Sequence, residues 1–305
     1  MMNFETKYEG EKIMDKKTIT LTVVANMTSN YSESLGNIGS VQKVYKKGHV
    51  YSIRSRESLK NAIMVQSGMY DDLVTTVNGA AQKEATQDRN AANNRALEGG
   101  YMTTDKDTYI RNSSFYLTDA IACEPFVNET RFHNNLYLAG NYAKANKLNL
   151  QKDAGEAGLM PYQYEYDKSM RIYSMTIDLE MIGTDPNFTE EADEEEKAER
   201  VNSLLSAVEN LSLVVKGNLD NAEPIFVVGG LSDRKTHYFE NVVKVIDNKL
   251  ELSEDLLHKI KKGYSVALLR GHNFDNEDEI IEKLNPIGVE DFFDTLREQV
   301  REYYQ

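Results

Sequence analysis

A chain of 305 residues with 40% hydrophobic content is long enough to bury a real core, as one large domain or two ordinary ones. Its net charge of −14 excludes a protein that coats nucleic acid with its whole surface, but it is compatible with a local basic groove. The single cysteine, Cys123, excludes an internal disulfide framework, and the five scattered histidines form no metal-ligand spacing, so we expect neither a metal nor a cofactor.

The N-terminal residues and the lengths of the apolar runs bear on the expected localisation. Residues 1–17 mix acids and lysines without an apolar core, which indicates a flexible N-terminal arm and not a signal peptide. The longest apolar runs, such as Ile225 to Val228, are far too short to cross a bilayer. We therefore expect a cytoplasmic protein with no membrane partner.

The first predicted elements are a strand, a long loop and a helix. Thr18 to Ala25 alternates and is rich in β-branched residues, which is typical of a strand with one buried face. A polar loop with Gly36 and Gly39 leads to a short extended piece, His49 to Ile53. Ser55 then has the character of an N-cap for a helix whose apolar face carries Leu59, Ala62 and Ile63.

This first loop and helix start form the most basic stretch of an acidic chain. Between Lys43 and Lys60 there are six basic residues and one acid, a net charge of +5 with His49 neutral. Glycines let a backbone approach a ligand, helix N–H groups attract anions, and the cations supply counter-charge, so the stretch suits a phosphodiester chain. A solvated basic loop before an ordinary core helix is the alternative. The candidate RNA-binding residues here are Asn26, Asn37, Ser40, Gln42, Lys43, Lys46, Arg54, Ser55 and Arg56.

Residues 66–112 change composition towards Ala, Asn, Gln, Gly and Thr, and we predict a helical insertion packed outside the core. Arg89 and Arg95 within it are candidate phosphate ligands, with simple solvation as the alternative.

A protruding arm is predicted between two strands. Phe115 to Ala122 has the pattern of one strand, and the alternation of Tyr173, Met175 and Ile177 marks the next. A connection as long as residues 123–168 without clear period is uncommon in a compact domain, so it has a function or a hairpin of its own. Its apolar and basic side chains either reach outwards or tuck back onto the core; the candidates are Phe126, Arg131, Phe132, Leu136 and Met160.

The second half of the chain completes an α+β pattern. An acidic run precedes a helix with Val201, Leu204 and Val208 on one stripe. The next strand ends in Gly229 and Gly230, where the backbone turns or approaches something closely, so both glycines are further candidate RNA-binding residues. The order strand, helix, strand, strand, helix, strand is the βαββαβ order of a ferredoxin-like or RNA-recognition-motif (RRM)-like sheet. A strand at 242–246, a helix after Ser253, a strand at 264–270 and a last amphipathic helix follow, and no linker divides residues 18–305 into separate domains.

Enzyme motifs are absent from the sequence. It has no phosphate-binding lysine loop, dinucleotide glycine fingerprint, serine elbow or metal-binding histidine pair. Adjacent acids such as Asp71 and Asp72 could hold a metal, although solvated pairs occur in any chain this acidic.

These features together resemble a known family. The parts that carry the resemblance are the first strand, the segment Leu35-Gly36-Asn37-Ile38-Gly39, the helix start after Ser52, the insertion, the long strand from Met170 to Ile182 and the segment Phe226-Val227-Val228-Gly229-Gly230. In these parts the chain resembles DevR-type CRISPR-associated proteins, which are the repeated backbone subunits of type I-B Cascade. The resemblance spans about Ile19 to Val300. The order of the parts makes it more specific than the loop alone.

The resemblance implies a modified RRM fold arranged like a hand. Copies stack as a filament along the spacer part of one guide RNA (crRNA), with other Cascade subunits and the paired target DNA strand as partners. The loop and helix start would form a palm that holds the sugar-phosphate chain, and the arm would be a thumb that displaces a base and reaches the next copy. Such a subunit accepts any spacer, because it contacts backbone and shape and leaves sequence reading to base pairing.

The resemblance also bears on catalysis. Related type III subunits cleave RNA with an aspartate in the loop after the first strand, whereas this chain has only Glu33 between Val24 and Val44. We therefore expect a non-cleaving binder. A metal-dependent ribonuclease on the same fold and a stand-alone autoregulatory nucleic-acid binder are the alternatives.

Overall fold

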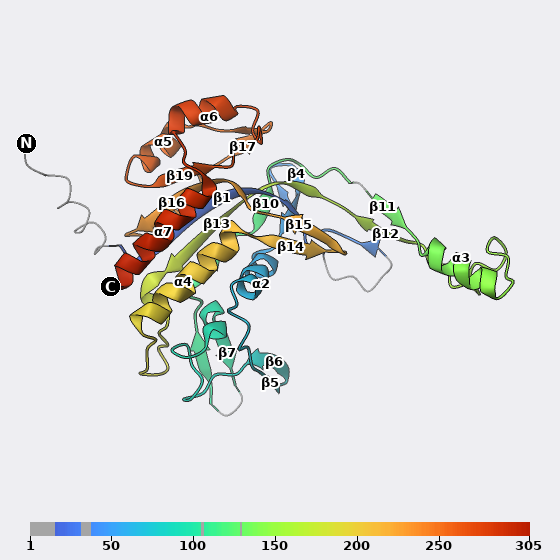
Figure 1. Cartoon of the computed structure of the whole chain (residues 1–305), viewed down its shortest axis with the longest axis horizontal. Coiled ribbons are helices and arrows are strands. Elements are labelled where there is room, and N and C mark those ends of the chain that lie inside the picture. The colour runs from blue at the N-terminus through green and yellow to red at the C-terminus, as the bar shows by residue number, and fades with distance from the viewer. Residues whose placement is uncertain (1–15, 32–37, 105–106, 129) are drawn as a thin grey trace, which may run out of the picture.

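The computed structural model describes residues 16–31, 38–104, 107–128 and 130–305. Its centre is an antiparallel sheet in the order β19-β16-β1-β13-β10-β4-β3, with β9 paired to β13 (Figure 1). The strands are β1 (Thr18–Thr28), β3 (Lys43–Lys46), β4 (His49–Arg54), β9 (Phe115–Leu117), β10 (Ala120–Ala122), β13 (Lys168–Asp178), β16 (Pro224–Ser232) and β19 (Ser265–Leu268). The predicted α+β class is confirmed.

Three helices cover one face of the sheet. They are α2 (Arg56–Gln66), α4 (Glu194–Glu209) and α7 (Val289–Tyr304), and α4 lies beside α7 across the strands (Figure 1). Their apolar stripes pack on Leu21, Val23 and Met175 in the larger hydrophobic core. The predicted cap is present, because Ser55 accepts a hydrogen bond from the amide of Ser58.

A second, smaller core covers part of the other face. It is built from α5 (Glu254–Ile260), α6 (Glu277–Leu284) and the short hairpin of β17 (Val245–Ile246) and β18 (Lys249–Leu250), packed on Val24 and Phe226. The prediction of one buried face for the first strand was therefore wrong: nearly every residue of β1 is buried. The hydroxyls on this second face are paired instead of solvated, as the 2.7 Å hydrogen bond between Thr22 and Ser174 shows.

The insertion was predicted to be helical, and this prediction was wrong. It consists of the hairpins β5 (Thr75–Asn78)–β6 (Ala80–Lys83) and β7 (Tyr101–Thr103)–β8 (Tyr109–Arg111), with one 3-10 helix, η1 (Arg95–Gly99). Gly79 takes φ 71° in the first turn, a conformation that favours glycine and closes the hairpin. The insertion has a small core of its own and is held to α4 by the buried carboxylate of Glu98, which contacts Arg111 at 2.9 Å and Arg200 at 2.8 Å.

Other differences from the predicted elements are local. The strand expected at 115–122 is divided into β9 and β10, and the strand expected at 242–246 is reduced to β17. The long strand β13 ends at Asp178, and a 3-10 turn, η2 (Leu179–Met181), follows it.

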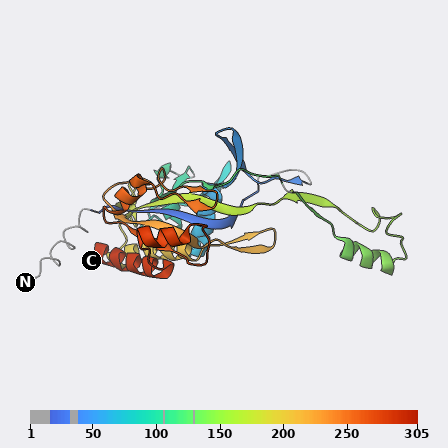
Figure 2. The same ribbon diagram turned by 90° about the horizontal axis from the view of Figure 1, so that it is seen from above.

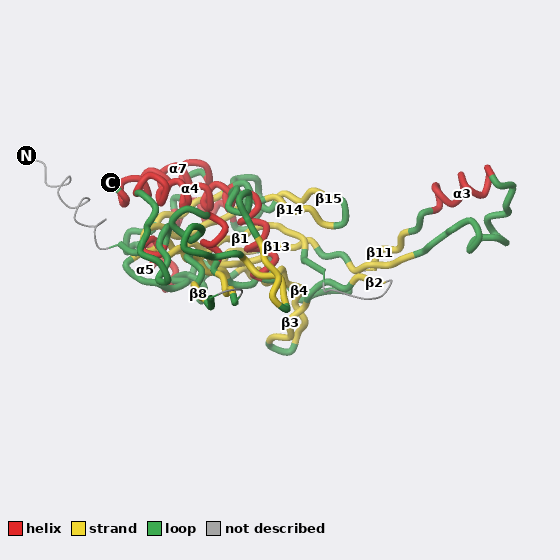
Figure 3. The backbone as a smooth tube through the Cα atoms, turned by 90° about the horizontal axis from the view of Figure 1, so that it is seen from below, coloured by secondary structure: helices red, strands yellow, loops and turns green. Residues whose placement is uncertain are grey.

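The segment between residues 123 and 168 projects far from the sheet (Figures 1 and 2). It consists of β11 (Thr130–His133), α3 (Leu136–Ala145) and β12 (Tyr162–Glu165), and β2 (Ile38–Gly39) pairs with β12 at its base. Two further hairpins leave the sheet near the arm: β3–β4, and β14 (Ser212–Val215)–β15 (Asn218–Asn221) (Figure 3). No helix in the part of the chain that the structure describes is long and apolar enough to cross a membrane.

Candidate nucleic-acid interface

The predicted palm lies where β1 ends and the arm begins. Asn37 and Glu33 lie outside the described residues, whereas Ser40 and Gln42 are half-buried. The amide of Gln42 donates to the carbonyl of Asn30 at 3.0 Å, and its carbonyl accepts from Ile53 at 2.9 Å, so the chain after the glycine loop is tied to both β1 and β4.

The lysines of the predicted palm are separated by the hairpin. Lys43 lies at its base, where its ammonium contacts Glu165 at 2.5 Å and lies 4.9 Å from the ring centre of Phe126. Lys46 and Lys47 lie at the exposed turn of β3–β4. Phe126, for which both a projecting and an inward position were left open, is half-buried, and its backbone amide donates to the carbonyl of Val50 at 2.7 Å.

The helix start offers less to an anion than the sequence indicated. Arg54 is buried: it donates to the carbonyl of Thr28 at 3.0 Å and to Ser58 at 2.8 Å, so it positions the loop and does not present its charge. Burial, with a contribution from Arg171, lowers the pKa of Arg54 to about 10. The amide of Arg56 already donates to Asp119 at 2.8 Å, while its guanidinium is exposed beside Glu57.

Arg171 is a buried residue that the sequence analysis missed. Its guanidinium donates to the carbonyls of Met27 at 3.1 Å and Ser52 at 2.7 Å, and it pairs with Asp167. Burial lowers its pKa to about 10. Arg171 thus joins β1, β4 and β13 where the palm loop starts. A charged residue on the same strand face as Tyr173 and Met175 was the signal that could have identified it.

The base of the arm brings together aromatic rings and cations. On one face of β11–β12, the ring of His133 stacks on Tyr164 at 4.6 Å and on Tyr162 at 5.5 Å, and Tyr31 meets Tyr164 edge-on at 6.0 Å. Two cations lie over rings of this surface: Arg131 is 3.6 Å from the centre of Tyr166, and Lys216 of the β14–β15 turn is 5.0 Å from that of Tyr31. We call this surface the arm base; its residues are Tyr31, Arg131, His133, Tyr162, Tyr164, Tyr166 and Lys216.

The far end of the arm is apolar and exposed. Leu136 and Met160 are 51% and 63% exposed, and the side chain of Asn135 holds them close by accepting from the amide of Met160 at 2.8 Å. Phe132 is 61% exposed on the hairpin face opposite His133. These predicted residues therefore reach outwards and do not tuck back onto the core.

The model of the CRISPR-associated negative auto-regulator DevR/Csa2 family matches residues 98–254, just over half of the chain. The chain belongs to this family. The matched segment includes the whole arm and the strands β13 and β16, so the DevR/Csa2 pattern covers every residue of the arm base except Tyr31.

Solved structures share the fold of this DevR/Csa2 protein. A chain described as "CRISPR RNA-guided surveillance complex, pre-nicking" has a TM-score of 0.54 and 9% identity, covering 84% of this chain and 93% of that chain. A chain of a "CRISPR RNA-guided surveillance complex" has a TM-score of 0.51 and 12% identity, covering 83% and 90%. No curated protein matches the sequence.

The remaining predicted residues of the DevR/Csa2 chain lie away from the arm base. In the insertion, Arg89 contacts Glu84 at 3.1 Å, and Arg95 forms a two-pronged pair with Glu196 at 2.8 and 2.7 Å, which neutralises both cations. Gly229 lies in mid-sheet, where a Cβ atom would come within 2.0 Å of the carbonyl of Thr20. Gly230 follows it in β16, but a Cβ atom there would come no closer than 3.9 Å to another residue, Tyr264, so close strand packing requires glycine only at 229.

The sequence analysis missed most of the arm base. Tyr31, His133, Tyr162, Tyr164, Tyr166 and Lys216 were not among the candidates, although the alternation of three tyrosines from residue 162 was a visible sign of one strand face.

Proposed function

We propose that this DevR/Csa2 protein is a non-catalytic subunit that binds guide RNA, with copies placed side by side along the spacer in a type I-B Cascade complex that recognises target DNA. The sheet order β16-β1-β13-β10, with α2 and α4 on one face, supports an RRM-like palm as its centre. The fold shared with chains of RNA-guided surveillance complexes agrees with this role.

The arm base is the observation that carries the proposal. Aromatic rings stack on bases of any identity, and cations attract phosphates, so a surface with both binds single-stranded RNA without reading its sequence. Tyr164 and His133 offer rings, and Arg131 and Lys216 supply charge beside them. This combination meets the need of a subunit that accepts any spacer.

The charge distribution fits the same role. The chain carries a net charge of −14, yet Lys46, Lys47, Lys216 and Arg131 gather on the hairpins and arm that leave one end of the sheet. An acidic body with local cations confines the RNA to one track, because like charge repels it from the remaining surface.

RNA recovery and binding measurements test the proposal directly. The purified protein is expected to carry short RNA molecules of similar length. It is also expected to bind different guide RNAs with similar affinity, even when their spacers are unrelated in sequence. Strong preference for one spacer sequence, or recovery of double-stranded DNA alone, would instead favour an autoregulatory binder.

A cleavage assay separates the proposal from a ribonuclease. Complex assembled on a guide is incubated with labelled complementary RNA and Mg²⁺, and the proposal expects the RNA to stay intact. Cuts at regular intervals that disappear with EDTA would show that the subunit is a metal-dependent nuclease.

A further inference from the structure

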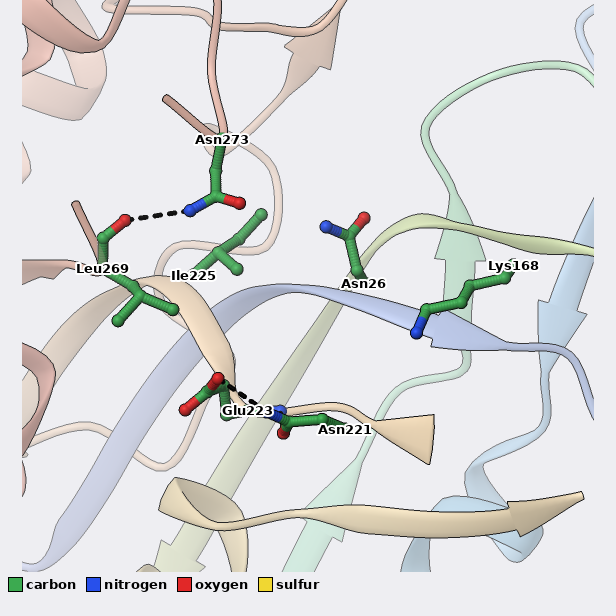
Figure 4. A pocket seen from close by; sticks show the side chains of 7 residues that line it. All are labelled: Asn26, Lys168, Asn221, Glu223, Ile225, Leu269 and Asn273. Atoms are coloured by element: carbon green, nitrogen blue, oxygen red, sulfur yellow. Dashed lines mark hydrogen bonds between the residues drawn. The ribbon is translucent and has the colours of Figure 1, made fainter. Parts of the chain in front are cut away.

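A polar cavity of about 430 Å³ opens at the end of β1, between β13, β16 and the segment after β19 (Figure 4). Its walls carry the side chains of Asn26, Lys168, Glu223 and Asn273, and its apolar surface is formed by Ile225 and Leu269. The volume lies in the lower part of the range of about 300–1,000 Å³ that small-molecule sites occupy.

Two amides face each other across this cavity. Figure 4 shows the side chains of Asn26 and Asn273 directed towards one another, with Ile225 between them. Asn273 is held in place because its Nδ2 donates to the carbonyl of Leu269 at 3.1 Å. No hydrogen bond joins the Asn26 amide to another residue within the described ranges, so its donor and acceptor are available to a ligand.

The charged groups on the walls are already engaged. Glu223 accepts from the amide of Asn221 at 2.7 Å, and the ammonium of Lys168 lies 2.5 Å from Asp220. A phosphate would thus meet a carboxylate and a neutralised lysine, which gives it no net attraction. A planar, uncharged ring with polar edges fits better, since its face packs on Ile225 and Leu269 while the amides satisfy its edges.

The cavity is connected to the arm base through β1. Asp220, which holds Lys168 at the rim, also accepts hydrogen bonds from the amide of Thr28 at 2.7 Å and from its hydroxyl at 3.0 Å. Thr28 ends β1 and is followed within three residues by Tyr31 of the arm base. The cavity and the arm base therefore share one end of the sheet.

We propose that this cavity receives one unpaired nucleobase of the RNA strand that lies on the arm base. This inference rests on the proposed function and adds a base-accepting site to it. The Asn26 amide contains both donors and an acceptor and can rotate to exchange them, whereas Asn273 is fixed by Leu269 and presents its oxygen. Asn26 therefore adapts to the edges of different bases, in keeping with a protein that binds many spacers.

The test separates base contacts from phosphate contacts. Affinity for a short single-stranded RNA is measured across a salt series, and the same RNA with abasic positions is the second ligand. Asn26→Leu, which preserves the side-chain volume, is expected to weaken binding of the normal RNA by about five- to tenfold. Its salt slope is expected to stay unchanged, because a neutral amide releases no counterion. The abasic RNA is expected to bind wild type and variant equally.

Matched variants make the result decisive. Asn273→Ala, on the opposite wall, is expected to reproduce the pattern and serves if Asn26→Leu does not fold. Arg131→Ala is the contrasting control, since it is expected to lower the salt slope for both RNAs. Equal weakening of normal and abasic RNA by the pocket variants, or no weakening of either, would overturn the cavity assignment. Failure of the wild type to bind RNA would instead overturn the proposed function.

A DNA oligonucleotide of the same sequence identifies the source of the base. An equal loss of affinity for RNA and for DNA in the Asn26→Leu variant would support a site that contacts the base and not the sugar. A loss confined to DNA would overturn the assignment to the guide and would place a displaced DNA base in the cavity.

Discussion

The basic side chains of this protein differ in whether they are buried, paired with an acid or exposed to solvent. Arg54 and Arg171 are buried and hold the palm loop, Lys43 is paired with Glu165, and Arg131 and Lys216 lie over aromatic rings at the surface. A cation over a ring retains its full charge, whereas one in an ion pair has lost most of its attraction for phosphate. If the proposed function is right, phosphate contacts are therefore expected at the arm base more than at the basic stretch of the sequence.

Removing both arm-base cations tests that assignment. The double variant Arg131→Ala, Lys216→Ala is expected to weaken RNA binding uniformly across spacers and to lower the slope of log affinity against log salt by about two, one for each phosphate contact. The measurement is a salt series by fluorescence anisotropy with several unrelated guides. Lys261→Ala, Lys262→Ala removes the same charge from an exposed site after α5 and is expected to leave the slope unchanged. Loss of affinity for some spacers only would contradict contacts to the RNA backbone.

Two half-buried lysines lead us to predict a pH dependence of stability. Burial lowers the pKa of Lys60 and of Lys83 from 10.5 to about 8, and their ammonium groups donate to the carbonyls of Gly99 and Ala96, each at 2.7 Å. Between these values the unfolded chain binds more protons than the folded one, so the free energy of unfolding rises with pH across this window.

The pH dependence of the free energy of unfolding is compared between the wild type and the double variant Lys60→Met, Lys83→Met. The difference between wild type and variant in the free energy of unfolding is expected to increase in favour of the wild type from pH 8 upwards, by at most about 1 kcal/mol per pH unit for each lysine. Urea unfolding is kept below about pH 9.5, where exposed tyrosines stay protonated. A difference that stays constant with pH would show that the lysines are charged to the same extent in both states.

Among the elements, the insertion and the arm are attached to the sheet in different ways. The insertion is held by a buried ion network in which Glu98 joins Arg111 and Arg200, whereas the arm continues two strands outwards and is held at its base by the pairing with β2 and by contacts of Glu165 with Lys43 and Tyr31. The attachment of the insertion is rigid because each buried charge needs its partner. The attachment of the arm leaves a long segment exposed to other molecules.

Glu98→Gln tests the first attachment. It leaves Arg111 and Arg200 without a counter-charge in the interior, so a loss of about 3–5 kcal/mol in the free energy of unfolding is expected. Glu196→Gln, which removes a half-buried partner of Arg95 and Arg200, is expected to cost less, about 1–2 kcal/mol. Chemical denaturation of both variants provides the comparison. Equal losses would mean that Glu98 is not the centre of the network.

At the scale of the whole molecule, the shape is a compact body with two main cores and one long projection (Figure 2). The exposed apolar end of the arm, with Leu136, Leu138 and Met160, lies far from either core. Apolar groups so placed favour contact with another molecule, which agrees with copies that touch along one RNA.

Shortening the arm separates folding from assembly. Replacement of residues 134–161 by a short Gly-Ser loop is expected to leave the unfolding midpoint nearly unchanged, because this segment contributes nothing to the two main cores. The shortened protein is expected to bind short RNA at the arm base, as proposed for the full chain, but not to form ordered multi-subunit particles on full-length guide. Particle mass and nuclease protection of the RNA measure the outcome. Full-size particles with the same protection pattern would show that the arm does not join neighbouring copies.

The sequence by itself determined the elements whose signals are local. The existence of strands β1 and β13, the Ser55 cap and the apolar stripe of α4 all depend on residues a few positions apart, and each was predicted correctly, although the burial of both faces of β1 was not. Only the tertiary structure decided which candidates reach the surface, because burial and pairing join distant segments: Lys43 meets Glu165, and Arg171 reaches Ser52. The arm base and the cavity are likewise built from residues of several strands, and no spacing along the chain reveals that they lie together.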